Sequence, residues 1–422
     1  MKLKTKKQIQ REKQILDIST MIAGDFKLHE VLDKLAESAV TVTKTQACSI
    51  RLLDEDQKEL KMRSTFGLSD EYRNKGVVSR HDPVIKAAFQ GDAVVIDNMQ
   101  DDERIKYPQA AMDEGLVSQL TVSMIFRSHK IGVLRLYSPK SKHFDEDAVA
   151  IARLVATQCA VAISNARFYA KAIEGARMEE QMRLAAIVQR RMIPDKSPEI
   201  INLDVAAIYR PCYQIGGDLY DFIRLDENTL AVGIADVIGK GIPAAIMMSM
   251  FRGTLRAYAD GGHNRHSLAE IVDKLNKVCC RECTDGEFIT VFLATIDTKN
   301  MTMTYCNCGH EPALLVRKGE ITELNKGGLV LGVLEDAEHE IATIDLQEGD
   351  HLIMYTDGLI DAVNFDGDMW GKDRMHKAID RYIVCPSADQ MIRRLLGYRR
   401  RFVGLARQTD DTSVVAIRVG KD

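Results

Sequence analysis

The chain has 422 residues and 45% of them are hydrophobic, which is enough for two or three domains with sizeable cores. Its formal net charge of −4 excludes the strongly basic classes that bind nucleic acid or anionic membranes, so we expect neither partner. The basic N-terminal segment 1–13 precedes no apolar stretch, and no run of about 18 apolar residues occurs, so we expect no signal peptide and no membrane span. Nine scattered cysteines are typical of reduced thiols and predict a cytoplasmic protein.

Residues 14–166 carry a mixed pattern of helices and strands. Apolar residues at helical spacing come first, two strands joined by an acidic turn follow at 47–67, and two more strands lie within 120–138. A long helix then opens with acidic residues in its first turn. This order, with the segment IGVLRLYS and the closing helix, resembles a GAF domain, which implies an α/β sensory module. A cyclic nucleotide, a haem, another small molecule, a protein signal or no ligand all remain open.

Residues 167–196 are predicted to be a helical linker. An apolar stripe recurs along it at steps of four, three, three and four, at Met178, Met182, Ala185, Val188 and Met192. Such a stripe on a charged helix predicts a coiled-coil seam and therefore a homodimer. The alternative is a helix that packs on its own domain. Two prolines in MIPDKSP end the helix.

Residues 197–422 change character, because short strand-like runs now alternate with turns and are interrupted by runs of helix. This grouping predicts an α+β layered fold rather than a doubly wound sheet. Within it, two strands flank the turn residues 226–228. If Glu227 is the centre of that turn, antiparallel pairing sets Asp218 beside Asp236 at one end of a sheet. Two adjacent carboxylates are unfavourable unless one is protonated or a cation lies between them.

The Gly-Lys pair at Lys240 raises the alternative of a phosphate-binding P-loop. That motif needs four residues between its first glycine and the Gly-Lys, followed by Ser or Thr. Here five residues separate Gly233 from Gly239, and Gly241 follows the lysine. The spacing excludes a P-loop and leaves Asp236 as the residue that carries the chemistry.

More acids lie at strand ends further along the chain. Asp357 follows an apolar strand, and Asp410 and Asp411 directly precede one. Each alone reads equally well as a turn or capping residue, but together with Asp218 and Asp236 they predict an oxygen-only metal site. Hard oxygen ligands select Mg²⁺, Mn²⁺ or Ca²⁺ over zinc.

Five segments in order, GGDLYD, ADVIGKGIPAA, GHEPALL, YTDGLIDA and DDTSVV, resemble the motifs of PPM-type, metal-dependent Ser/Thr protein phosphatases. The match is best with the branch of the stage II sporulation protein E and regulator-of-sigma phosphatases. The resemblance implies an α/β/β/α sandwich with two Mn²⁺ or Mg²⁺ ions at one end of its sheets. It implies a direct role in catalysis for Asp218 and Asp236, and a metal-ligand set of Asp218, Asp236, the backbone carbonyl of Val237, Asp357, Asp410 and the adjacent Asp411.

Some positions depart from the eukaryotic branch of that family. Gln214 stands where that branch has a phosphate-binding arginine, and Arg210 is the nearest substitute. The histidine that can act as general acid is absent, His310 reads as structural, and Lys240 as a solvated loop lysine. The protonation of the leaving group is therefore unassigned.

These observations predict a sensor-regulated phosphoserine/phosphothreonine protein phosphatase. The family resemblance implies that its substrate is a phosphorylated anti-sigma factor antagonist in a bacterial partner-switching pathway. Two alternatives stay open, a non-catalytic metal-binding signalling module and a metal-dependent hydrolase of a small phosphoester.

Overall fold

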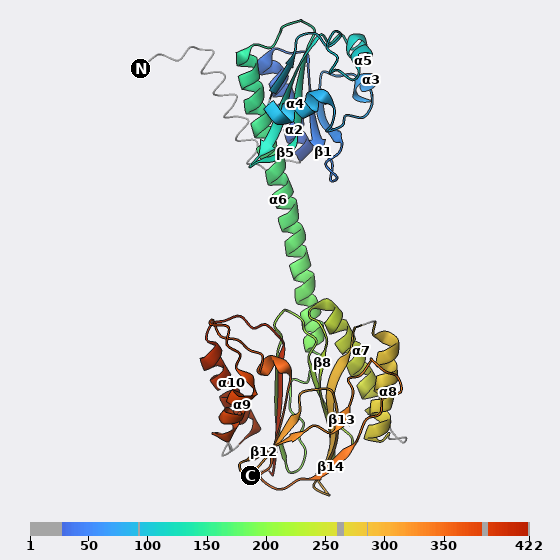
Figure 1. Cartoon of the computed structure of the whole chain (residues 1–422), viewed down its shortest axis with the longest axis vertical. Helices are drawn as coiled ribbons and strands as arrows, with labels where there is room; N and C mark the ends of the chain where they lie inside the picture. The colour runs from blue at the N-terminus through green and yellow to red at the C-terminus, as the bar shows by residue number, and fades with distance from the viewer. Residues whose placement is uncertain (1–27, 92, 260–265, 285, 382–386, 421–422) are drawn as a thin grey trace, which may run out of the picture. The chain divides into compact units, whose positions relative to one another are not determined.

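The computed structural model describes residues 28–91, 93–259, 266–284, 286–381 and 387–420. The predicted basic segment and the first residues of the predicted sensory domain fall outside this range. The chain forms two compact units, Met1–Ala176 and Arg177–Asp422 (Figure 1). The predicted domain boundaries at 166 and 196 stay a prediction. One uninterrupted helix, Glu146–Arg190, runs through residue 166 and through the division between the two units.

The N-terminal unit is a five-stranded antiparallel sheet in the order β2-β1-β5-β4-β3. Its strands are β1 Ala47–Leu53, β2 Leu60–Phe66, β3 Ala93–Ile96, β4 Ser118–Phe126 and β5 His129–Ser138. Helix α2 (Leu28–Thr43) and the start of α6 (Glu146–Arg190) cover one face with an apolar core. The other face is covered by α3 Asp70–Arg73, α4 Pro83–Gly91 and α5 Pro108–Asp113.

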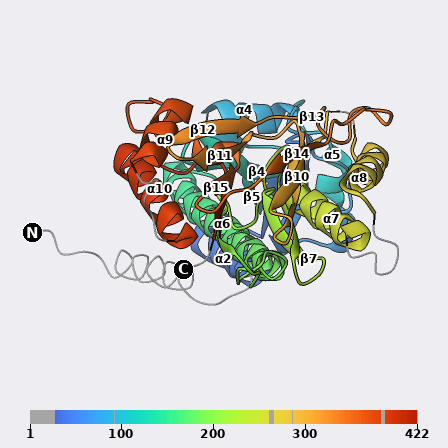
Figure 2. The ribbon, with the colours of Figure 1, turned by 90° about the horizontal axis from the view of Figure 1, so that it is seen from below.

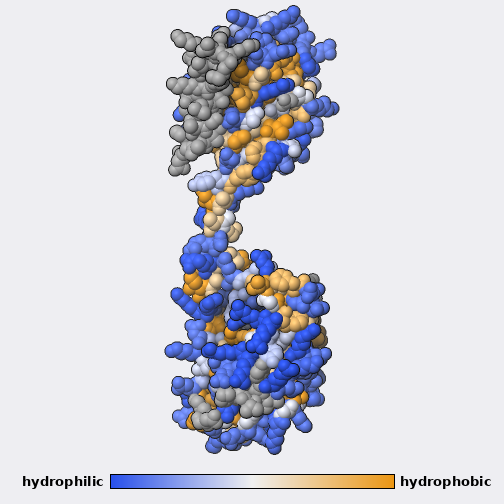
Figure 3. All heavy atoms as spheres, turned by 90° about the vertical axis from the view of Figure 1, so that its left-hand side faces the viewer, coloured by the Kyte–Doolittle hydropathy of each residue, from blue (hydrophilic) through white to orange (hydrophobic). Residues whose placement is uncertain are grey.

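Helix α6 changes its surroundings along its length. Its first turns are buried against the sheet, at Ala152, Cys159 and Ile163 for example. Beyond residue 166 its side chains are mostly exposed, and apolar ones remain visible on its surface (Figure 3). By length and composition α6 is the one described helix that could cross a membrane, and half of the qualifying window is buried within the protein. A core helix of a folded domain meets the same criterion.

The C-terminal unit contains two sheets. The first has the order β13-β10-β9-β8-β7, with β14 added on β10, and the second has the order β12-β11-β15-β16-β6. The strands of the first are β7 Leu219–Arg224, β8 Thr229–Val237, β9 Ile289–Asp297, β10 Thr302–Cys308, β13 Gly327–Gly328 and β14 Ala342–Asp345. Those of the second are β6 Leu203–Arg210, β11 Ala313–Arg317, β12 Glu320–Leu324, β15 His351–Tyr355 and β16 Thr412–Val419.

Helices cover the outer face of each sheet. Helices α7 (Ile242–Ala259) and α8 (Leu268–Glu282) pack on the first sheet, and α9 (Gly371–Asp380) and α10 (Ala388–Val403) on the second (Figures 1 and 2). The core between the two sheets closes a four-layer α/β/β/α sandwich, as predicted.

The burial of the central strands explains their composition. In β15 all five residues are buried, because Leu352 and Met354 face the core between the sheets while Ile353 and Tyr355 face α9 and α10. A strand covered on both faces reads as a continuous apolar run rather than an alternating one. Polar side chains therefore gather where such strands end, and that is where the candidate site lies.

Candidate active site

The hairpin β7–β8 has the predicted register. Leu219 pairs with Ala235, which brings Asp218 and Asp236 to the same end of the sheet. The turn follows from local chemistry, since the Asp226 carboxylate accepts a hydrogen bond from the backbone N–H of Asn228. The strand signals and the turn residues were therefore sufficient to place these two acids together.

Asp218 is almost completely buried, with 1% of its surface exposed. It accepts a hydrogen bond of 2.7 Å from Oγ1 of Thr356, and that oxygen in turn accepts one of 2.9 Å from the backbone N–H of Ser413. Burial, and then the charge of Asp236, raise the pKa of Asp218 well above its usual range. The sequence analysis did not identify Thr356 as a partner of Asp218. Its position in YTDG, between the strand and Asp357, was the one sequence feature that could have indicated it.

Asp236, Asp357 and Asp410 line one pocket with a cavity volume of about 280 Å³. They come from the end of β8, the start of the short 3₁₀ helix Asp357–Leu359 and the loop before β16. Burial first, then Asp357 and Asp410, raise the pKa of Asp236 to about 7. Burial and Asp410 raise the pKa of Asp357 to about 6. When these carboxylates are ionised, they repel one another in the pocket.

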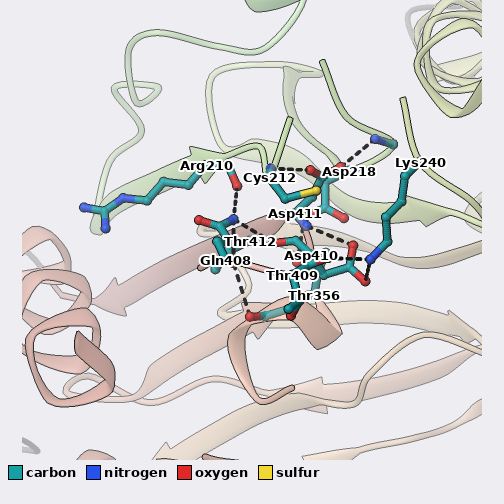
Figure 4. Close-up of polar contacts among 12 residues, drawn as sticks. Arg210, Cys212, Asp218, Lys240, Thr356, Gln408, Thr409, Asp410, Asp411 and Thr412 are labelled. Carbon is teal, nitrogen blue, oxygen red and sulfur yellow. Dashed lines mark hydrogen bonds and ion pairs between the residues drawn. The ribbon is translucent and has the colours of Figure 1, made fainter. Parts of the chain in front are cut away.

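Lys240 is not the solvated loop lysine that the sequence suggested. Its Nζ lies 2.8 Å from Oδ2 of Asp410 and donates a 2.5 Å hydrogen bond to the carbonyl of Thr409 (Figure 4). The lysine also lines the pocket. It holds the loop of Asp410 by a cation–carboxylate contact whose two side chains are 38% and 33% exposed. At such exposure the contact contributes about 1 kcal/mol at most.

Asp411 has two backbone partners rather than a place among the pocket-lining acids. It is 4% exposed and accepts hydrogen bonds of 2.7 Å from the N–H groups of Cys212 and Gly217 (Figure 4). A Cβ on Gly216 would lie 2.1 Å from Oδ2 of Asp411. One on Gly217 would lie 2.9 Å from the carbonyl oxygen of Val237. The two glycines of GGDLYD are thus required by close approach, because a side chain at either would collide with Asp411 or with the Val237 carbonyl.

The end of helix α6 is attached to the same loop. Gln189 donates from Nε2 to the carbonyl of Gly216 at 2.7 Å, and its Oε1 accepts from the N–H of Gly216 at 3.1 Å. Gln189 is buried while its helical neighbours Val188 and Arg190 are exposed. This reciprocal pair places the linker helix two residues from a predicted metal ligand, and nothing in the sequence pattern had marked it.

The remaining candidates are assigned by their contacts. Arg210 extends away from the carboxylates, and only its backbone carbonyl is engaged there, by Nε2 of Gln408 (Figure 4). Gln214 is exposed. His310 is buried beside the pocket, where Nδ1 lies 2.8 Å from Oγ1 of Thr290, and burial lowers its pKa to about 4. A neutral, hydrogen-bonded imidazole at this position agrees with a structural role.

The donor set fits a divalent cation held by oxygen. The pocket offers carboxylates whose pKa values are raised by burial and then by mutual repulsion, and a cation would remove that repulsion. In the part of the chain that the structure describes, however, no three His, Cys, Asp or Glu side chains are grouped closely enough to hold one ion. Asp218 is held by Thr356, Asp410 by Lys240 and Asp411 by backbone N–H groups. In this arrangement Asp410, a predicted ligand, pairs with Lys240.

Residues 226–420 match the family described as stage II sporulation protein E (SpoIIE), and residues 27–164 match the GAF domain family. The chain is 31% identical over 220 residues to phosphoserine phosphatase RsbU of Bacillus subtilis, covering 52% of this chain and 64% of RsbU. It is 26% identical over 187 residues to phosphoserine phosphatase RsbP of the same organism, covering 43% of this chain and 46% of RsbP. The chain thus spans less than two thirds of the length of either relative.

Among solved structures, the SiaA-PP2C domain of Pseudomonas aeruginosa matches with a TM-score of 0.51 at 17% identity. The match covers 58% of this chain and 98% of that domain. At this identity the likeness concerns the fold alone. It agrees with the four-layer sandwich of the C-terminal unit, at whose sheet ends the acidic pocket lies.

Proposed function

We propose that this chain, a GAF domain joined to a phosphatase domain of the SpoIIE type, is a metal-dependent phosphoserine/phosphothreonine protein phosphatase controlled by its sensory domain. The observation that carries the proposal is the pocket in which Asp236, Asp357 and Asp410 meet at the sheet ends of a PP2C-like sandwich. Its relatives RsbU and RsbP are both named phosphoserine phosphatases.

The acids of the pocket would hold the metal. Asp218, Asp236, the Val237 carbonyl, Asp357 and Asp410 are the proposed ligands, with two Mn²⁺ or Mg²⁺ ions expected. When bound, such ions activate water and neutralise charge on a phosphoryl group. The protein's own part is to hold the carboxylates in position. Thr356 fixes the oxygen of Asp218 that faces it, and Asp411 holds the backbone on which Asp218 sits.

A protein substrate agrees with the rim of the pocket. Ile238 lines the pocket at 40% exposure, and Ile242 is 49% exposed at the start of α7. Exposed apolar side chains beside a charged pocket suit the surface of a folded protein better than a nucleotide. Within that class we propose a phosphorylated anti-sigma factor antagonist, acting in the cytoplasm. None of the described cysteines forms a disulfide, in agreement with a reducing compartment.

The linker helix is proposed to pair with a second copy of itself and to transmit the state of the sensor. Met178 and Val188 of the predicted seam are 58% and 54% exposed, as a surface that awaits a partner would be. Gln189 supplies the connection to catalysis, because it bonds to the loop that carries Asp218. A rotation or shift of α6 would therefore move a predicted metal ligand.

The test is a comparison of substrates on the full chain. A phosphoserine-carrying anti-sigma factor antagonist should be hydrolysed in the presence of Mn²⁺ or Mg²⁺, and chelation should stop the reaction until metal is restored. Preference for a nucleotide panel over the phosphoprotein would favour a small-phosphoester hydrolase. Metal binding without hydrolysis of either substrate or of p-nitrophenyl phosphate would favour a non-catalytic module.

A further inference from the structure

The sheet of the sensory unit is buried on both faces, but the two faces differ in chemistry. The face under α2 and α6 is apolar, with Ile50, Leu120 and Leu134 among its residues. The face under α3, α4 and α5 carries a polar strip on the three central strands. Its members are at most 7% exposed and comprise Ser49, Arg51, Gln119, Thr121 and Arg135. A buried polar strip in the middle of a sheet is costly unless its groups are satisfied.

Strand register gathers this strip around Arg135. Ser49 of β1 and Thr121 of β4 both lie directly opposite Arg135 of β5. Arg51 stands two residues along β1 from Ser49 and so shares its face. Two arginines are thereby buried on the same face of the sheet, at diagonal positions of adjacent strands. Each guanidinium group repels the other, and both would attract an anion placed between them.

Neither arginine has its donors satisfied. Nε and Nη2 of Arg51 and Nε of Arg135 are buried without a hydrogen-bond partner among the described residues. The one hydrogen bond found for Arg51 runs from Nη1 to the carbonyl of Leu60 at 3.2 Å. In the same described range neither arginine forms an ion pair with a carboxylate. A buried, uncompensated guanidinium is rare in a folded domain, because removal of a charge from water costs several kcal/mol.

A third basic side chain, Lys75, meets Arg135 at a small cavity that Arg51 does not line. Lys75, Arg135 and Gln119 line it, together with Tyr72, and its volume is about 30 Å³. Nζ of Lys75 lies 3.0 Å from the centroid of the Tyr72 ring. Burial, and then the charges of Arg135 and Arg51, lower the pKa of Lys75 to about 6. Burial and the neighbouring arginines thus favour the neutral form of the Lys75 amine at this position.

The nearby acids are already engaged. Glu114 accepts hydrogen bonds from the N–H and the hydroxyl of Ser69. Asp82, at the wall of the cavity, pairs with Lys106 at 3.4 Å. The charge missing from this part of the domain is therefore negative.

We propose that this cavity binds a compact oxyanion, a phosphate or a small dicarboxylate, through Arg135 and Lys75, with Arg51 behind them. Guanidinium groups suit such ligands because their N–H donors match two oxygens at once. The volume admits about two water-sized groups, so even a phosphate enters only when the lining side chains move, and a nucleoside would need a much larger rearrangement. The site belongs to the sensory unit, so the inference stands or falls independently of the proposed phosphatase activity.

The experiment is calorimetric titration of the full chain, kept in chelator so that the phosphatase pocket holds no metal. Inorganic phosphate and malonate are the probes, at constant ionic strength, with cyclic GMP as the bulky comparison. Arg135→Gln keeps some donors but loses the charge and should weaken binding by about tenfold or more. Lys75→Met should also weaken it. Arg63→Gln, at an exposed arginine of the neighbouring strand β2, is the matched control and should bind as the wild type does.

Thermal melting separates a ligand site from a structural one. Without ligand, Arg135→Gln should melt at the same temperature as the wild type or higher, because it removes an uncompensated buried charge. Saturable binding of phosphate or malonate that is lost in Arg135→Gln and Lys75→Met supports the proposal, and the two probes distinguish the two ligand sources. Binding of cyclic GMP alone, equal binding by all variants, or no binding at millimolar concentration overturns it. If Arg135→Gln fails to fold, Lys75→Met and the control decide by the same criteria.

Discussion

The two units of this chain each gather like charges into one pocket, and they do so with opposite signs. In the C-terminal unit Asp236, Asp357 and Asp410 meet at the ends of strands. In the N-terminal unit Lys75 and Arg135 line a pocket over the sheet, and Arg51 is buried on the same face of that sheet. In both pockets, burial and then mutual repulsion shift the pKa of at least one member in the direction that favours its neutral form. Each pocket therefore favours a ligand of the opposite charge.

The difference between the pockets lies in how they are built. Asp236 lies at the end of β8, whereas Asp357 and Asp410 lie on a 3₁₀ turn and a loop, and Lys240 already pairs with Asp410. The arginines sit on the central strands, where the ladder of hydrogen bonds fixes them in place. A carboxylate on a loop can change its partner, whereas an arginine on a central strand keeps its position and a ligand must come to it. This suits a catalytic pocket in one unit and a sensing pocket in the other.

The largest expected effect is at Asp236. Asp236→Asn should lower turnover on p-nitrophenyl phosphate by at least about a hundredfold, since even outer-shell groups of metal sites cost about 10–100-fold. Its melting temperature without metal should stay the same or rise, because one charge leaves a repelling cluster. Near-normal turnover at saturating metal would remove Asp236 from the proposed metal ligands and with it the comparison of the two pockets.

The next effect separates Asp357 from Lys240. Asp357→Ala should raise the metal concentration needed for half-activity by about 10–100-fold, through loss of a direct ligand. Lys240→Met should lower that concentration by up to about fivefold, because it frees Asp410 from an ion pair worth about 1 kcal/mol at most. Activity is titrated with Mn²⁺ in both variants. The opposite order of severity would point to a mechanism centred on the lysine.

The third effect concerns regulation rather than chemistry. One alanine inserted after Gln181 turns the preceding helix by about 100° relative to the C-terminal unit. Seven inserted residues restore the face, because two turns of a coiled coil take seven. The short insert should uncouple activity from the sensor, and the long one should preserve much of the regulation. Both keep Gln189 on Gly216, so basal turnover on a small phosphoester should survive.

That insertion pair needs the oligomeric state beside it. Sedimentation of the wild type should report a dimer at working concentration. A monomer, or regulated activity that is unchanged by both inserts, would contradict the proposed seam.

The smallest effect is thermodynamic and lies in the sensory pocket. The pKa of Lys75 is about 6 in the folded chain and above 10 when unfolded, so the folded state binds fewer protons between these values. The destabilisation is complete below pH 6 and shrinks as the pH rises toward 10. Lys75→Met should therefore raise the melting temperature by a few degrees at pH 6 and by less at pH 9. Scanning calorimetry of the full chain measures this, with the exposed Lys58→Met as control.

Much of the C-terminal site was accessible from the sequence. Asp226, Glu227 and Asn228 set the turn, and the turn sets the register that pairs Leu219 with Ala235. The four-layer sandwich and the meeting of Asp236, Asp357 and Asp410 followed from strand ends and from the family resemblance. Their roles as metal ligands stay a prediction. Lys240 was misjudged, because its partner lies 170 positions away on a loop that only the fold brings near.

The sequence by itself determined whatever depends on neighbours along the chain, such as the turn chemistry, the hairpin register and the long helix with its apolar stripe. Tertiary structure alone decided which distant groups touch. Gln189 reaches Gly216 across the end of the linker helix, and Thr356 reaches Asp218 across two sheets. The basic pocket shows the same limit, since Arg51 and Arg135 alternate with apolar residues as on any half-exposed strand. The helices packed over that face bury both arginines. Burial removes their charges from water, and a buried charge favours a bound partner of opposite sign.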